Sequence, residues 1–142
     1  MSGTAEDAAR AQQPPVREIL QALWDQFELP NKPGLDEHKD PGGLRACLFT
    51  ASSDSTSWAE TARLRVSEVK DPALEARQAQ LARDWLEENG WEELDNPAPE
   101  GDLVSYHRNA EGFTVTLTPW GDARVQVDVQ SPCFDEQGRQ VG

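Results

Sequence analysis

The sequence is poor in positive charge. Its 142 residues carry 13 Lys and Arg against 26 Asp and Glu, so the formal net charge is −13 at pH 7. A protein that binds DNA or RNA needs clustered Lys and Arg to contact the phosphates, so we expect no nucleic-acid partner. The same imbalance disfavours binding to anionic membrane surfaces.

Long apolar runs are also missing. No window approaches the ~20 apolar residues of a membrane span, so we expect no direct insertion of this form into a membrane. No basic segment followed by an apolar stretch opens the chain, so no signal peptide is visible in it. The length fits one domain, and five Trp and four Phe offset a lean hydrophobic fraction of 37%.

Residues that commonly carry chemistry are few. The two histidines, His38 and His107, and the two cysteines form no close ligand pair, so we expect no metal site and no cofactor. The motifs of serine hydrolases, zinc proteases and nucleotide-binding loops do not occur. This inventory favours a protein that is not an enzyme, with His107 on a solvated strand face. A small enzyme that uses His107 with a carboxylate is the alternative.

The cysteine pair allows two interpretations. Cys47 and Cys133 are widely separated, and an even count permits one disulfide that closes a long loop. Two buried free thiols fit the residues equally well, because a free Cys behaves as a small hydrophobic side chain. The residues alone leave both interpretations open.

Two amphipathic helices and several strands are predicted from the spacing of apolar residues. The first helix runs from Val16 to about Glu28 and is ended by Pro30. The second runs over 72–89, with Asp71 as its N-cap. Strands are predicted at 44–50, at 58–69, from Trp91 onward, and at 103–108, 113–118 and 123–130.

These elements predict an α+β fold. The last three strands alternate apolar and polar residues and are joined by Gly-containing turns, which is typical of an antiparallel meander with one face on the core. We expect one antiparallel sheet, with this meander in the C-terminal third and both helices packed on one face. The domain organisation is then a flexible leader over 1–13, a single α+β domain over 14–134 and a frayed tail over 135–142.

The net negative charge is concentrated at one junction. The segment from Glu87 to Asp102 contains no Lys or Arg. Glu87 and Glu88 fall in the last helical turn, where the helix dipole disfavours negative charge. The residues with partner-binding potential there are Glu87, Glu88, Glu92, Glu93 and Asp95. Such a run either keeps an exposed face soluble or meets a basic partner.

A tryptophan in a turn is a second candidate for binding. Trp120 lies between two predicted strands, where a large apolar side chain has less chance of burial. An exposed loop tryptophan can anchor a partner. A turn tryptophan can equally fold back over the sheet.

Several short motifs resemble the mature domains of small secreted actinobacterial lipoproteins, which are uncharacterised. They are the stretch WLEENGW over 85–91, the hairpins around Gly112 and Gly121, and SPCF over 131–134. The resemblance implies an envelope or extracellular location, a Cys47–Cys133 disulfide and no known enzymatic activity. The lipobox and signal peptide of that class are missing here, so a lipid anchor would require a longer precursor.

We therefore expect a non-enzymatic binding domain that is secreted or associated with the cell envelope. It would meet a basic protein surface through its acidic segment, with help from Trp120. The alternative is an acidic immunity or inhibitor protein that works in the cytoplasm by covering a basic active site. That alternative predicts reduced thiols.

Overall fold

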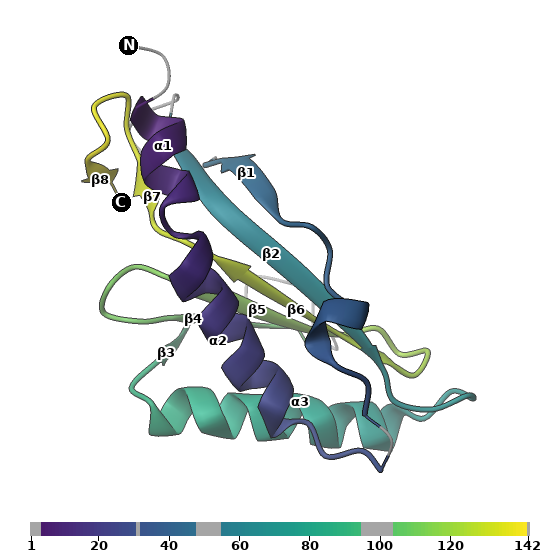
Figure 1. Cartoon of the computed structure of the whole chain (residues 1–142). Coiled ribbons are helices and arrows are strands. Elements are labelled where there is room, and N and C mark those ends of the chain that lie inside the picture. Colours follow the sequence, from purple (N-terminus) through teal and green to yellow (C-terminus); the bar gives the residue numbers. More distant parts are fainter. Residues whose placement is uncertain (1–3, 31, 48–54, 95–103, 142) are drawn as a thin grey trace.

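The computed structural model describes residues 4–30, 32–47, 55–94 and 104–141 (Figure 1). The N-terminal part contains helices α1 (Thr4–Arg10) and α2 (Gln13–Gln26), the short 3₁₀ helix η1 (Leu35–Glu37), strands β1 (Gly43–Ala46) and β2 (Thr56–Arg65) and helix α3 (Pro72–Glu88). The C-terminal part contains strands β3 (Glu92–Leu94), β4 (Ser105–Arg108), β5 (Thr114–Pro119), β6 (Arg124–Gln130), β7 (Cys133–Phe134) and β8 (Gln140–Val141).

The strands form one antiparallel sheet in the order β3-β4-β5-β6-β2-β7-β8, and β1 pairs with the other edge of β2. The hairpins β4–β5 and β5–β6 have the predicted order, with Val115 opposite both His107 and Val129. The α+β prediction is thus confirmed. A nonlocal pairing joins the N-terminal and C-terminal strands into this sheet, because β6 lies beside β2 through seven residue pairs.

The core lies between the sheet and the helices (Figure 1). Alternating residues of the central strands are fully buried, and α2 and α3 cover the same face. The buried side chains of the sheet include Ala62, Leu64, Val115, Leu117, Val125, Val127 and Val129, and those of the helices include Val16, Leu20, Leu23, Trp24, Ala82 and Leu86. Each such large aliphatic side chain stabilises the fold by roughly 1.5–3 kcal/mol through its burial.

Helix α3 begins and ends where its sequence predicts. The Asp71 side chain accepts a hydrogen bond from the backbone N–H of Leu74 at 3.1 Å, and Pro72 occupies the first turn. These residues satisfy or remove N–H groups that the first turn leaves without partners. Gly90 follows the helix with a φ of +82°, a conformation that glycine adopts without strain.

The N-terminal segment is a helix where the sequence predicted a flexible leader. Ala5 and Ala9 of α1 are buried, and α1 packs on β2 and β7. Small alanine side chains let the helix approach the sheet closely, although they give no strong apolar stripe in the sequence. The chain bends between α1 and α2, because Pro14 and Pro15 have no N–H to continue the hydrogen-bond ladder.

The predicted tail also has structure. A turn at Asp135 leads into β8, and Val141 pairs with Cys133. The side chain of Asp135 accepts hydrogen bonds from the backbone of Gln137 and Arg139. Local side-chain-to-backbone bonds of this kind define a turn in a sequence that has few core residues.

Strand β2 ends earlier than its sequence pattern suggests. The prediction reached Val69, but the strand ends at Arg65, and Val69 is 71% exposed. The part of the predicted first strand beyond Cys47 lies outside the described residues.

A buried carboxylate fastens the loop after η1 to the sheet. Glu60 of β2 is 1% exposed and is paired with the ammonium group of Lys39. It also accepts a hydrogen bond from the indole of Trp58 at 2.9 Å. Gly42 passes so close that an added Cβ would lie 2.8 Å from Cγ of Glu60, so this position excludes a larger residue.

Among the described helices, none is long and apolar enough to span a membrane.

Candidate functional site

The acidic residues of the predicted site gather at the C-terminal end of α3. Glu87 and Glu88 are exposed in its last turn, and Glu92 and Glu93 are exposed on β3, which follows after the turn at Gly90. Strand β3 is a terminal strand of the sheet. We call Glu87, Glu88, Glu92 and Glu93 the acidic end. Asp95, the fifth predicted residue, lies outside the described residues.

A hollow of about 360 Å³ lies at the acidic end. Its lining residues are Gln80, Arg83, Glu87, Trp91, Glu93 and His107. Arg83 holds Glu93 through contacts of 2.9 and 3.1 Å to its two carboxylate oxygens, so the charge of Glu93 is partly neutralised. In the part of the chain that the structure describes, the carboxylates of Glu87, Glu88 and Glu92 have no ion-pair partner.

His107 is buried at the floor of this hollow, not solvated as its sequence position suggested. It is 3% exposed, and its Nε2 lies 2.9 Å from the Ser105 hydroxyl. Loss of solvent lowers the pKa of His107 below 6.5, while Glu93 raises it and Arg83 lowers it further. The neutral imidazole is therefore the favoured form at neutral pH.

The cysteines form the disulfide Cys47–Cys133. It joins Cys47, the residue after β1, to Cys133 of β7. The bond thus connects two strands that both pair with Thr56 of β2. With both sulfurs in this bond, neither is a thiolate that would act with His107 as a Cys–His pair.

Trp120 lies at the opposite end of α3 from the acidic end. The turn that carries it is held by Glu75 in the first turn of α3, which accepts hydrogen bonds from the backbone N–H of Gly121 at 2.7 Å and of Ala123 at 2.8 Å. Because a helix rises 1.5 Å per residue, Glu75 and Glu87 are about 18 Å apart along its axis. The structure therefore does not unite Trp120 with the acidic residues in one surface.

The indole of Trp120 folds back over the sheet. Its N–H donates to Gln126 at 3.2 Å, and the guanidinium groups of Arg124 and Arg63 lie 4.6 and 5.9 Å from its ring centre. It is still 46% exposed. Arg124 also pairs with Asp122, and this hydrogen bond lowers the pKa of the Asp122 carboxyl.

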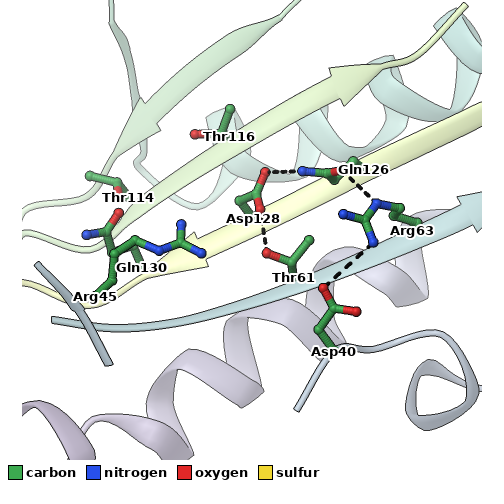
Figure 2. A pocket seen from close by; sticks show the side chains of 9 residues that line it. All are labelled: Asp40, Arg45, Thr61, Arg63, Thr114, Thr116, Gln126, Asp128 and Gln130. Atoms are coloured by element: carbon green, nitrogen blue, oxygen red, sulfur yellow. Dashed lines mark hydrogen bonds and ion pairs between the residues drawn. The ribbon is translucent and has the colours of Figure 1, made fainter. Parts of the chain in front are cut away.

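A second hollow lies on the sheet face that points away from α2 and α3 (Figure 2). Its volume is about 420 Å³. All of its lining side chains are polar, and most come from β2, β5 and β6: Asp40, Arg45, Thr61, Arg63, Thr114, Thr116, Gln126, Asp128 and Gln130. We call this the outer-face hollow.

The alternating pattern of β5 and β6 predicts a solvated face for their polar residues but no hollow there. The missing information was the pairing of β2 with β6, which sets Thr61 opposite Asp128 and Arg63 opposite Gln126. The alternation of Thr, Arg, Gln and Asp in three strands was the available signal. It indicates a solvated face and does not distinguish a flat face from a hollowed one.

Comparison with known proteins adds no relative to this picture: no family model, no curated protein and no solved structure matches the chain.

Proposed function

We propose that the chain is a non-enzymatic binding domain whose acidic end contacts a basic surface of a protein partner. The observation that carries the proposal is the gathering of exposed carboxylates from α3 and β3 at one end of the fold, where two of them, Glu87 and Glu93, line one hollow. Arg83 pairs with Glu93 alone, so the carboxylate of Glu87 remains to meet a Lys or Arg side chain that enters the hollow.

The position of these charges on the fold supports a role in recognition. Glu87 and Glu88 lie at the negative end of the α3 dipole, where a carboxylate costs stability instead of adding to it. A residue that breaks a local rule of stability without compensation is a candidate for function. A basic partner would neutralise both the carboxylates and the helix end.

The same proposal places the domain outside the cytoplasm, in the cell envelope or the extracellular space. The Cys47–Cys133 disulfide supports this location, because disulfides persist in oxidising compartments and are rare in the cytosol. The resemblance to secreted lipoproteins agrees with it.

Charge neutralisation at the acidic end tests the proposal. The variant Glu87→Gln/Glu88→Gln/Glu92→Gln removes three exposed carboxylates and leaves the Arg83–Glu93 pair intact. Binding is measured by surface plasmon resonance to an immobilised peptide rich in Lys and Arg, at several salt concentrations. We expect the association rate to fall about tenfold at low salt, because charge complementarity acts mainly on this rate.

A matched control separates a local surface from the net charge of the molecule. The variant Glu6→Gln/Glu18→Gln/Glu68→Gln removes the same three charges from exposed positions elsewhere on the fold. We expect its association rate to stay within about twofold of the parent. Equal losses for both variants would sink the proposal, since net charge alone would then explain the binding.

The location is tested by counting thiols in protein purified from its native source. We expect no free thiol. Two free thiols would favour the alternative of a cytoplasmic immunity or inhibitor protein.

A further inference from the structure

We propose that the outer-face hollow is a binding site for a neutral saccharide. This site is independent of the acidic end, since it lies on the sheet face that α2 and α3 leave uncovered and uses residues of β2, β5 and β6 (Figure 2). The ligand would occupy the hollow of about 420 Å³ through hydrogen bonds to side chains.

The polar groups of the hollow are held in place before any ligand arrives. Asp128 accepts hydrogen bonds from the Thr61 hydroxyl and, at 2.9 Å, from the Gln126 amide. The Gln126 carbonyl accepts in turn from Arg63 at 2.9 Å. Figure 2 shows this chain of contacts running across the floor of the hollow, from Asp128 to Arg63 and on to Asp40. Side chains fixed on paired strands form a more exact site than side chains on loops.

Other groups of the hollow keep hydrogen-bonding capacity for a ligand. Among the described residues, the guanidinium of Arg45 and the hydroxyls of Thr114 and Thr116 have no side-chain partner, and these groups border the hollow beside Asp128 and Gln130 (Figure 2). The Asp128 carboxylate can accept more than the two bonds it receives. The hollow thus offers both donors and acceptors over a short distance.

A saccharide matches this arrangement. Each of its hydroxyls donates and accepts, so two neighbouring hydroxyls can bond a carboxylate and a guanidinium together. Apolar ligands are disfavoured because every lining residue is polar. A peptide strand is disfavoured because β5 and β6 are already paired on both edges.

Anionic ligands fit less well. Asp40 and Asp128 balance Arg45 and Arg63 within the hollow, and the whole chain carries −13, so phosphates and polyanions are repelled. Among the described residues no group of three His, Cys, Asp or Glu side chains is placed to hold a metal ion. The hollow therefore favours a ligand that carries no negative charge and bonds through hydroxyls.

The proposal is tested by NMR titration of the isotope-labelled full chain with three tetrasaccharides: maltotetraose, chitotetraose and tetragalacturonate. We expect at least one of the two neutral probes to bind and to shift the backbone amide signals of Thr114, Thr116 and Asp128. The acidic end should show no change in its signals. The acidic probe should bind more weakly than the neutral one.

A conservative variant with a matched control establishes that the hollow itself binds. Thr116→Val removes one free hydroxyl from the lining, whereas Thr118→Val makes the same change on the same strand outside the lining. We expect Thr116→Val to raise Kd about fivefold, the effect of one lost hydrogen bond of about 1 kcal/mol. We expect Thr118→Val to leave Kd unchanged. Thermal unfolding confirms that both variants fold.

Three results would overturn the proposal. They are no binding of either neutral probe at millimolar concentration, binding of the acidic probe alone, or amide shifts that lie outside the hollow.

Discussion

The two ends of helix α3 carry the same kind of residue in opposite circumstances. Glu75, at the N-terminal end, is 1% exposed and receives two backbone hydrogen bonds from the turn between β5 and β6. Glu87 and Glu88, at the C-terminal end, are exposed and have no ion pair among the described residues. A negative charge is favourable at the first end of a helix and unfavourable at the second.

This difference separates the carboxylate that holds the fold from those that are available to a partner. The Glu75 carboxylate satisfies the N–H groups of Gly121 and of Ala123, whose φ of +78° is unusual for a residue with a side chain. Glu75 of α3 therefore holds this turn in place. Removing Glu87 or Glu88 breaks no bond of the described structure and changes mainly the electric field around that end.

The largest expected effect on stability comes from replacing the buried carboxylate of Glu75. Glu75→Gln puts an amide NH₂ where a carboxylate oxygen accepts a bond, so one backbone N–H loses its acceptor. We expect the free energy of unfolding to fall by about 3 kcal/mol in urea denaturation, because an unsatisfied buried group costs about 1–3 kcal/mol and the lost bond is to a charged group. Glu87→Gln is the control. A loss below about 0.5 kcal/mol would show that Glu75 does not hold the turn.

A smaller effect is expected from the buried histidine beside the acidic end. Burial lowers the pKa of His107 below its unfolded value of 6.5, against the pull of Glu93. The unfolded chain therefore binds this proton more readily, and stability is lost as pH falls through 6.5 toward the folded pKa.

The comparison of wild type with His107→Gln isolates this loss. We expect the stability of the variant to fall less between pH 7 and pH 5, as measured by thermal or urea unfolding at each pH. Arg83, Glu87 and Glu93, which line the same hollow, are present in both proteins. Parallel pH profiles would contradict the burial of a neutral imidazole.

The smallest effect is expected at the exposed end. Glu87→Gln/Glu88→Gln removes two charges from the unfavourable end of the α3 dipole, so we expect a gain of about 0.3–1 kcal/mol in the free energy of unfolding at low salt. The gain should shrink as salt is added. A loss of stability would show that these carboxylates have a structural partner.

The sequence predicted the elements that depend on local chemistry. Asp71, Pro72 and Gly90 mark the ends of α3, and the alternation of Val125, Val127 and Val129 predicts their burial in β6. Those features depend on residues close together in the chain, so a local pattern is sufficient to identify them.

The features that the sequence did not predict, or predicted wrongly, depend on tertiary contacts. Ala5 and Ala9 of α1 are buried only because the sheet lies beneath them. The separation of Trp120 from the acidic end follows from the length of α3, and the outer-face hollow follows from the pairing of β2 with β6. The disulfide was open on the residues alone, and the resemblance to secreted lipoproteins implied it.

The most direct test of the account is to map the residues that a basic partner contacts. We would titrate the isotope-labelled chain with the peptide rich in Lys and Arg and record the backbone amide shifts. We predict changes at residues 83–94, around the C-terminal end of α3 and β3, and none in the turn that Glu75 holds. Shifts centred on that turn and Trp120, or spread evenly over all exposed carboxylates, would contradict the assignment of binding to the acidic end.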